Sequence, residues 1–368
     1  MKKLISLLLI LITPQVWADV CEWPQWQTFK SIYLEQGRVI DGSDERLITT
    51  SEGQSYALFF ALVANDQQTF SQVLSWTEKH LAGGDLTAQL PAWLWGRTEN
   101  GRFDVLDSNP ASDSDLWIAY ALVEAGRLWD NHYYQSLGHL LASRILREET
   151  AMIEGIGTIL LPAPVGFHLE QGYRVNPSYV PLQLLARMQA LYPQYSWQSM
   201  YQSSAKMLFG TMPAGFSPDW ATLHKGQFSS DEVTGPLGSY NAIRTYLWTG
   251  MLDDNVAEKA ALVEAMQPFI TATKTLGAPP REVDTQTGHF SQLGSAGFSA
   301  AALPLLSAVG QSDLAEAQAK RVKVELVSDR NDHYYDNVLS LFGLGWYEGH
   351  YRFGEQGELL PAWSEQCQ

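Results

Sequence analysis

Apolar residues recur along the chain in a helical pattern that takes two forms. Four segments are apolar around most of a helical circumference; they span residues 55–66, 116–129, 179–192 and 298–309. More amphipathic segments follow the first three of them, at residues 70–82, 133–149 and 197–209. Because helices that are apolar all round are usually buried, the alternation predicts helical hairpins arranged in two concentric layers.

The remaining pattern predicts an all-α chain with small β additions. Periodicity distinguishes roughly a dozen helical segments, about six pairs, and a small hairpin is expected within residues 152–167. No linker or low-complexity run divides the chain, so we expect one domain over residues 19–368. The connections before the inner helices are rich in Gly, Pro, Ser and Asp. Such loops, clustered at one end of a ring, are a natural place for a functional site.

The first 18 residues have the pattern of a secretory signal peptide. Lys2 and Lys3 precede an apolar run at 4–12, and residues 16–18 end in a small residue suited to cleavage. The run is far shorter than the roughly 20 residues of a membrane-spanning helix, and no later segment is apolar for long enough. We therefore expect an exported mature chain without a membrane span.

Charge and cysteine content narrow the possible partners and cofactors. The chain has 24 basic and 40 acidic residues, a formal net charge of −16. This charge disfavours nucleic acid and anionic membranes as partners and is compatible with neutral or cationic ones.

The chain has two cysteines, Cys21 and Cys367, which have none of the spacings of a metal site, so we predict neither a metal nor another cofactor. In an oxidising compartment they are expected to form a disulfide; the alternative is two unpaired thiols.

Acidic residues at two predicted helix starts are candidates for chemistry. Thr49 and Glu52 have the T-x-x-E spacing of a capping box, so Glu52 has a structural alternative as a helix cap. Ser112 and Asp115 allow a similar, weaker cap. Asp113 then remains as an acid in the first turn, explained only by the helix dipole. A helix start lowers a carboxyl pKa, so a general acid here needs burial or a second carboxylate to raise it.

Aromatic residues lie near these acids in the sequence. Trp93 and Trp95 belong to the Pro/Gly-bounded stretch 91–96, and Tyr240 lies in another polar connection. Sugar rings stack on aromatic planes, although most of the 13 Trp are expected in the core. An exported acidic helical protein with carboxylates and aromatics at one end fits glycoside hydrolysis, which uses one carboxylic acid and one carboxylate.

Ten stretches of the sequence carry a family resemblance. They are, in order, CEWPQW, ITTSEGQSYALFFALVAND, LPAWLWG, VLDSNPASDSDLW, NPSYVP, GFSPDW, SYNAIR, GFSAAALPLL, LFGLGW and GELLPAW. Together they resemble glycoside hydrolase family 8, and within it the periplasmic endoglucanases encoded with bacterial cellulose synthase. The resemblance implies an (α/α)6 toroid and inverting hydrolysis of β-1,4-glucan or cello-oligosaccharides. It also implies a periplasmic location, with cellulose synthase envelope components as further partners.

The resemblance implies roles for individual residues as well. Glu52, in SEGQSY, matches the family's general acid, and Asp113 matches an Asp that contacts the sugar being cleaved. Ser114 stands where the family signature has Gly or Ala. Tyr179 matches a tyrosine of the reactive subsite, and Arg244 matches the arginine of the SYDAIR motif.

Position 241 departs from the family pattern. In active endoglucanases of this type the motif reads SYDAIR and its Asp activates water, whereas this chain has Asn241, and an amide is a very weak proton acceptor. Three explanations stay open: Asp231, Glu232 or Asp113 serves as a substitute base; the protein is a weak or inactive glucan binder; or the residue is engineered or misread. A chitosanase is a further alternative, because the family includes chitosanases and an acidic surface attracts a cationic polymer.

Overall fold

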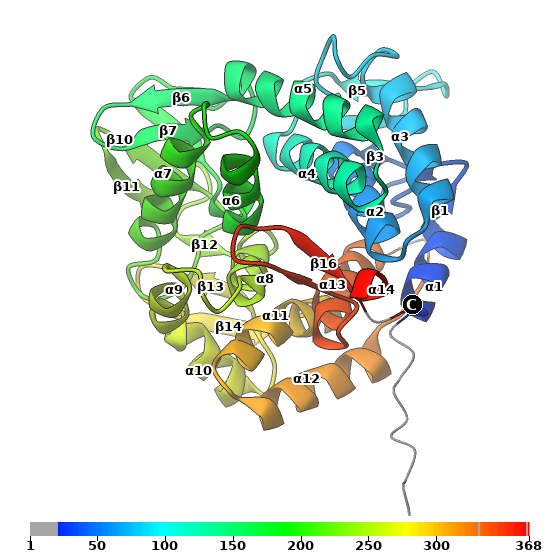
Figure 1. Ribbon diagram of the computed structural model, residues 1–368. Coiled ribbons are helices and arrows are strands. Elements are labelled where there is room, and N and C mark those ends of the chain that lie inside the picture. The colour runs from blue at the N-terminus through cyan, green and yellow to red at the C-terminus, as the bar shows by residue number, and fades with distance from the viewer. Residues whose placement is uncertain (1–20, 330–331, 366, 368) are drawn as a thin grey trace, which may run out of the picture.

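Six helices form the inner wall of a ring in the computed structural model, which describes residues 21–329, 332–365 and 367 (Figure 1). They are α2 (Ser51–Val63), α4 (Ser112–Leu128), α6 (Leu182–Leu191), α8 (Ala242–Met251), α11 (Ala296–Ala308) and α13 (Tyr334–Tyr347). Each contacts the next one around the ring. The rings of Phe60 and Phe342, with centroids 4.6 Å apart, join α2 to α13 and close the wall.

A second layer of helices surrounds this wall (Figure 1). It consists of α1 (Pro24–Tyr33), α3 (Gln67–Leu81), α5 (His132–Glu148), α7 (Trp197–Gly210), α9 (Lys259–Ala265), α10 (Gln267–Leu276) and α12 (Ser312–Glu325). Helices α3, α5, α7 and α12 each pack on the inner helix before them, α9 and α10 cover α8, and α1 packs on α13. The arrangement has the two concentric layers that the apolar pattern predicted, and it is the (α/α)6 toroid that the family resemblance implied.

Burial follows the two forms of the apolar pattern. Every residue of α2 except Glu52 is buried, whereas α3 buries one side, on which Phe70 and Val73 lie one turn apart. The inner helices also approach one another closely, since a Cβ atom at Gly343 of α13 would collide with the carbonyl group of Ala300 in α11. Glu52 is therefore the one residue of its helix that the fold leaves available for another purpose.

Short strands fill the connections between the helices. The sheets are β1 (Leu34–Glu35) with β2 (Arg38–Val39); β3 (Thr49–Thr50) with β4 (Leu94–Arg97) and β5 (Phe103–Asp107); β6 (Thr150–Ile153) with β7 (Gly157–Leu160); β8 (His168–Leu169) with β9 (Gly172–Val175), β10 (Ala221–His224) and β11 (Gln227–Ser230); β12 (Leu237–Gly238) with β13 (Pro280–Asp284) and β14 (Phe290–Leu293); and β15 (Tyr351–Phe353) with β16 (Leu359–Pro361). The antiparallel β6–β7 pair overlaps the hairpin expected within 152–167, but it begins at residue 150 and ends at residue 160. Strand β3 leads directly into α2 and β12 precedes α8, so these sheets help to position two inner-helix starts.

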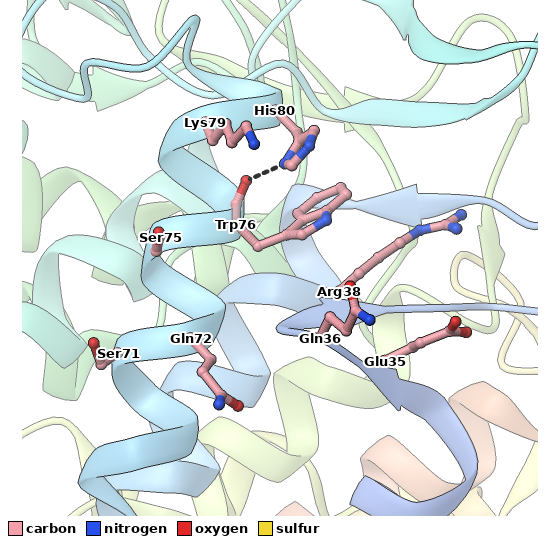
Figure 2. Close-up of a pocket in the computed structure, with 9 residues that line it drawn as sticks. All are labelled: Glu35, Gln36, Arg38, Ser71, Gln72, Ser75, Trp76, Lys79 and His80. Carbon is pink, nitrogen blue, oxygen red and sulfur yellow. Dashed lines mark hydrogen bonds between the residues drawn. The ribbon is translucent and has the colours of Figure 1, made fainter.

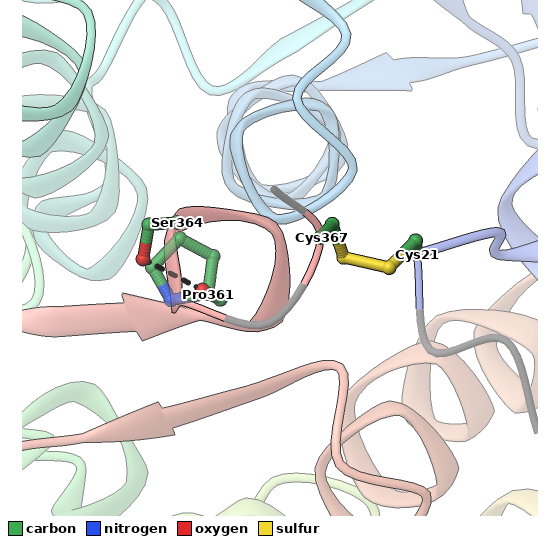
Figure 3. Close-up of a disulfide and its surroundings, with 4 residues drawn as sticks. All are labelled: Cys21, Pro361, Ser364 and Cys367. Atoms are coloured by element: carbon green, nitrogen blue, oxygen red, sulfur yellow. Dashed lines mark hydrogen bonds between the residues drawn. A yellow bond between two sulfur atoms is a disulfide. The ribbon is translucent and has the colours of Figure 1, made fainter. Parts of the chain in front are cut away.

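A disulfide joins the two ends of the described chain. Cys21 precedes α1, and Cys367 follows the short helix α14 (Ala362–Glu365); their Cα atoms are 5.7 Å apart (Figure 3). Residues 1–18, expected to be a signal peptide, lie outside the described residues. Within the described ranges, no helix combines the length and apolar character needed to cross a membrane.

Candidate active site

The guanidinium group of Arg244, in the first turn of α8, connects three inner helices. Its Nη1 binds the Glu52 carboxylate of α2 and donates to the Tyr56 hydroxyl at 2.9 Å and to Asp113 Oδ2 of α4 at 3.3 Å. Its Nη2 donates to Asn241 Oδ1 at 2.8 Å. The side chain of Arg244 is only 4% exposed. The structure therefore gathers the predicted residues Glu52, Asp113, Asn241 and Arg244 into one contact cluster.

Glu52 is not a helix cap. The N-cap of α2 is Thr50, whose hydroxyl accepts from the amide of Gly53 at 3.0 Å. The Thr49 hydroxyl instead donates to the carbonyl of Val39, because the pairing of β3 with β4 places Thr49 in a sheet. The capping-box alternative is therefore wrong, and the Glu52 carboxylate, 26% exposed, is directed to Arg244.

Asp113 is buried in the first turn of α4. Burial is the main reason why its pKa is raised to about 7; the negative charge of Glu52 adds to the shift and Arg244 opposes it. Ser114, which replaces the small residue of the family signature, supplies two donors to Asp113 Oδ1: its amide at 2.7 Å and its hydroxyl at 3.2 Å. Near neutral pH the Asp113 carboxyl group can therefore either hold or accept a proton.

A second carboxyl pair lies behind Asp113. Asp115 and Glu149 are both fully buried, and burial is the main cause that raises the pKa of each well above its ordinary value. The negative charge of Asp115 adds to the rise in the pKa of Glu149, and neither carboxyl group has a hydrogen-bond partner among the described residues. Helix α4 has Ala111 as its N-cap and no side-chain cap, so the expected cap formed by Ser112 and Asp115 is wrong, because Ser112 is already the first residue of the helix.

Asn241 has its amide oxygen fully engaged. Asn241 Oδ1 accepts from Arg244 Nη2 and from Asn176 Nδ2, the latter at 3.3 Å. The remaining terminal atom of the side chain is Nδ2, and an amide nitrogen is a donor that accepts no proton. A carboxylate in the same orientation would place its second oxygen there. The side chain of residue 241 therefore lies where a base could act, but it lacks the second oxygen that would accept the proton.

A carboxylate from a distant loop caps the start of α8. Asp219, between α7 and β10, accepts at Oδ1 from the backbone amides of Ser239, Asn241 and Ala242 at 2.7–2.9 Å. Burial raises the pKa of Asp219, and the three amide donors oppose that shift. The hydroxyl of Ser239 donates to the carbonyl of Arg281, so Ser239 does not cap the helix. Asp219 instead fixes the backbone of Asn241.

Tyrosine side chains surround the cluster. Tyr179, at the end of the 3-10 helix η1 (Pro177–Tyr179), has its ring 5.7 Å from the guanidinium carbon of Arg244. Tyr240 is 45% exposed, and its carbonyl accepts from the Tyr335 hydroxyl of α13 at 2.8 Å. Tyr179 thus lies at the cluster, and Tyr240 presents an exposed ring one residue before Asn241.

The two tryptophans of the 91–96 stretch have different surroundings. The carbonyl of Trp93 accepts from the amide of Ser51 at the start of α2, and the Trp93 side chain is 36% exposed. Trp95 is packed: the Phe103 ring stacks on it with centroids 5.1 Å apart, and the Arg38 guanidinium lies 4.3 Å from its ring centroid. Trp93 therefore remains the better candidate for a sugar-stacking surface.

Asp231 and Glu232, the loop acids considered as substitute bases, lie outside the contact cluster of Arg244. Both carboxylate oxygens of Asp231 accept from Arg174, at 2.9 and 3.0 Å, and Thr234 donates to one of them. Although burial alone would raise it, these donors hold the pKa of Asp231 below its ordinary value. Glu232 is exposed. Neither residue hydrogen-bonds to the side chain of Arg244 or Asn241 in the part of the chain that the structure describes.

Four residues of the cluster escaped the sequence analysis: Tyr56, Asn176, Asp219 and Tyr335. Tyr56 carries a usable signal, because it follows Glu52 by four residues on one helix face. Asn176 and Asp219 lie inside NPSYVP and GFSPDW, but only their contacts with α8 reveal what they do.

Among the described residues, no group of three or more His, Cys, Asp or Glu side chains could hold a metal ion.

The chain is similar to known enzymes over most of its length. The family model described as "Glycosyl hydrolases family 8" matches residues 4–349. An endoglucanase of Salmonella typhi is 45% identical over 355 residues, and one of Escherichia coli (strain K12) is 44% identical over 357 residues; both alignments cover 94% of this chain and 93% of the relative. The crystal structure of endo-1,4-D-glucanase from Vibrio fischeri ES114 has a TM-score of 0.87 and 55% identity, covering 93% of this chain and 99% of that one.

Proposed function

The chain belongs to glycosyl hydrolase family 8 and is a glycoside hydrolase, and on this premise we propose that it cleaves internal β-1,4 linkages of a glucan with inversion. The observation that carries the proposal is the cluster in which one guanidinium group binds Glu52, Asp113 and Asn241. The relatives are named endoglucanase and endo-1,4-D-glucanase, which supports this substrate class.

In the proposed reaction, Glu52 is the general acid. It is the only residue of α2 that is not buried, so its carboxyl group can reach the oxygen of a leaving sugar. Arg244 holds the Glu52 carboxyl group in place beside Asp113, since one guanidinium nitrogen contacts both.

The proposed mechanism lacks the usual carboxylate for activating the attacking water. In an inverting glycosidase a carboxylate removes a proton from the attacking water, and Asn241 can orient water but not take its proton. Of the substitute bases considered, Asp113 fits best, because it belongs to the cluster and its pKa is about 7. Both oxygens of Asp231 are already held by Arg174. We therefore expect slower turnover than in a relative with Asp at this position.

The cellular setting is part of the same proposal. The pattern of residues 1–18 supports export to the periplasm, and a disulfide between Cys21 and Cys367 is compatible with an oxidising compartment. The resemblance to endoglucanases encoded with cellulose synthase supports β-1,4-glucan strands in the cell envelope as the substrate, with envelope components of that machinery as neighbours.

The deciding experiment measures the release of reducing ends from soluble carboxymethylcellulose by the purified mature chain. Proton NMR of the first product formed should show the α-anomer if the β linkage is cleaved with inversion. A parallel assay on chitosan tests whether the net charge of −16 selects a cationic polymer instead. No release from either polymer, by protein with a cooperative melting transition, would contradict the proposed hydrolysis.

A second candidate function is glucan binding with little or no turnover, and the amide of Asn241 is the observation that favours it. Isothermal titration with cellohexaose distinguishes the two. Binding without any release of reducing ends supports the binder, whereas release that is saturable with cellohexaose concentration supports the enzyme.

A further inference from the structure

An open groove of about 630 Å³ lies outside the catalytic cluster, between α3 and the β1–β2 hairpin (Figure 2). Serine and glutamine side chains of α3 form one wall, and residues 35–38 form the other. Figure 2 shows the Trp76 indole pointing from α3 into the space between these walls, with His80 above it. The groove is thus on the outer layer of the ring, whereas Glu52 and Arg244 belong to inner helices.

The lining of the groove has the chemistry of a neutral polyhydroxylated ligand. Gln36, Ser71, Gln72 and Ser75 all present neutral groups, and their hydroxyl and amide groups both donate and accept hydrogen bonds. The charged lining residues are Arg38 and Lys79 against Glu35, a small positive excess, and the Arg38 guanidinium is already engaged by the Thr49 hydroxyl and the Trp95 ring. Such a lining suits sugar hydroxyls better than it suits a metal ion.

Aromatic rings form the upper end of the groove. Trp76 stacks with His80, with centroids 4.5 Å apart, and meets the edge of Trp95 at 5.3 Å. Trp95 in turn stacks with Phe103, which is 40% exposed. Aromatic planes beside hydrogen-bonding side chains are the usual means of holding an apolar sugar face together with its hydroxyl edge.

Strands β2 and β4 link the groove to the catalytic cluster. Trp95 lies in β4, and Trp93, two residues earlier, contacts the start of α2 through its backbone. Arg38 in the groove wall donates from Nε to the Thr49 hydroxyl at 2.9 Å, just before Glu52. A polymer strand that extends past Trp93 out of the cluster would therefore be directed over β4 toward Trp76.

We propose that this groove is an accessory binding site for a β-1,4-glucan strand, separate from the site of cleavage. The proposal rests on the proposed function for the identity of the polymer. Its consequence is specific: the groove contributes to the binding of long chains and not to the hydrolysis of short ones, because a short oligosaccharide bound at Glu52 does not reach the outer layer.

The test compares groove variants with the parent on long and short substrates. Trp76→Ala and Gln72→Ala should each weaken retention on insoluble cellulose and in gels containing carboxymethylcellulose. For Trp76→Ala we expect about a fivefold loss of affinity, in keeping with one aromatic contact. The initial rate on cellohexaose should stay within about twofold of the parent value for both variants, a change of under about 0.5 kcal/mol. Gln72 is exposed on α3, so its variant tests the groove even if Trp76→Ala proves unstable.

A second hollow of about 540 Å³ provides the control. It is lined by Gln198 of α7 and by Tyr201, whose hydroxyl is tied to Glu258 at 2.6 Å. Gln198→Ala matches Gln72→Ala chemically and should leave polymer retention unchanged. Unchanged retention of folded Gln72→Ala and Trp76→Ala would overturn the accessory site while leaving the hydrolytic proposal intact. A parent protein that binds cellulose through the groove but releases no reducing ends would overturn hydrolysis and not the groove.

Discussion

Replacing Asn241 with Asp is the most informative single change in the cluster. The Asn241 oxygen already accepts from Arg244 at 2.8 Å and from Asn176 at 3.3 Å, and a carboxylate of nearly equal size can keep both donors on one oxygen. The other oxygen then replaces Nδ2 and becomes a proton acceptor. The backbone does not need to move, because the amide of residue 241 is already fixed by Asp219.

The expected magnitude has two parts. A positioned general base contributes about 10²- to 10⁴-fold to a rate, equivalent to about 3–5 kcal/mol of barrier. The new charge also competes with Glu52 and Asp113 for one guanidinium group. At the separation of about 6.5–9.5 Å that inversion requires, and at an effective dielectric of about 20, two negative charges repel by about 2–3 kcal/mol. The Arg244 guanidinium, which contacts both Glu52 and residue 241, offsets part of this repulsion.

The assay is the initial rate of reducing-end release from soluble carboxymethylcellulose by parent and Asn241→Asp, with Asn241→Ala as the matched control. We expect Asn241→Asp to exceed the parent by at least about 10² and Asn241→Ala not to exceed it. The melting temperature should change little. A well-folded Asn241→Asp variant that is no faster than a clearly active parent would refute the reasoning and indicate a relocated base.

Three further predictions address the other cluster residues. Glu52→Gln should abolish hydrolysis and leave cellohexaose binding nearly intact, because Gln cannot donate the proton; full activity, measured as reducing ends, would contradict the assignment. Trp93→Ala should weaken cellohexaose binding by roughly 1–2 kcal/mol, whereas Trp95→Ala should mainly lower the melting temperature, since Trp95 is packed; equal melting losses without any change in binding would show that both are core residues. Because the pKa of Asp113 is raised from 3.8 to about 7, the native state binds this proton more tightly than the unfolded chain. The parent should therefore lose up to about 4 kcal/mol of stability as pH rises from about 4 to above 7. Asp113→Asn should show a flatter pH dependence of its melting temperature; parallel curves for the two proteins would contradict the raised pKa.

The helical layers were predictable because burial in this fold follows the local pattern. The inner helices α2 and α11 are apolar around most of their circumference and nearly all of their residues are buried, so their burial could be predicted from the local sequence alone. The amphipathic α3 likewise buries the stripe that its sequence shows. The Cys21–Cys367 disulfide followed from composition and from the expected compartment.

Helix starts were less predictable, because strand pairing and distant loops decide them. Thr49 has the correct spacing for a capping box with Glu52, but its pairing with Trp95 places it in a strand and makes Thr50 the cap. Asp219 is followed by 19 residues before Ser239, yet it supplies the acceptor for three amides at the start of α8. Local spacing carries no information on such contacts.

The candidate site draws on residues that are far apart along the chain. Glu52, Asp113 and Arg244 belong to α2, α4 and α8, and their contacts exist only when those helices stand in one closed wall. A chain that is still being synthesised or exported holds the acid without its arginine, and no fragment that ends before α8 contains the complete cluster. Activity should therefore appear in a single step with completion of the ring, which gives hydrolysis a defined onset in time and makes the enzymatic assay a direct measure of the fully assembled molecule.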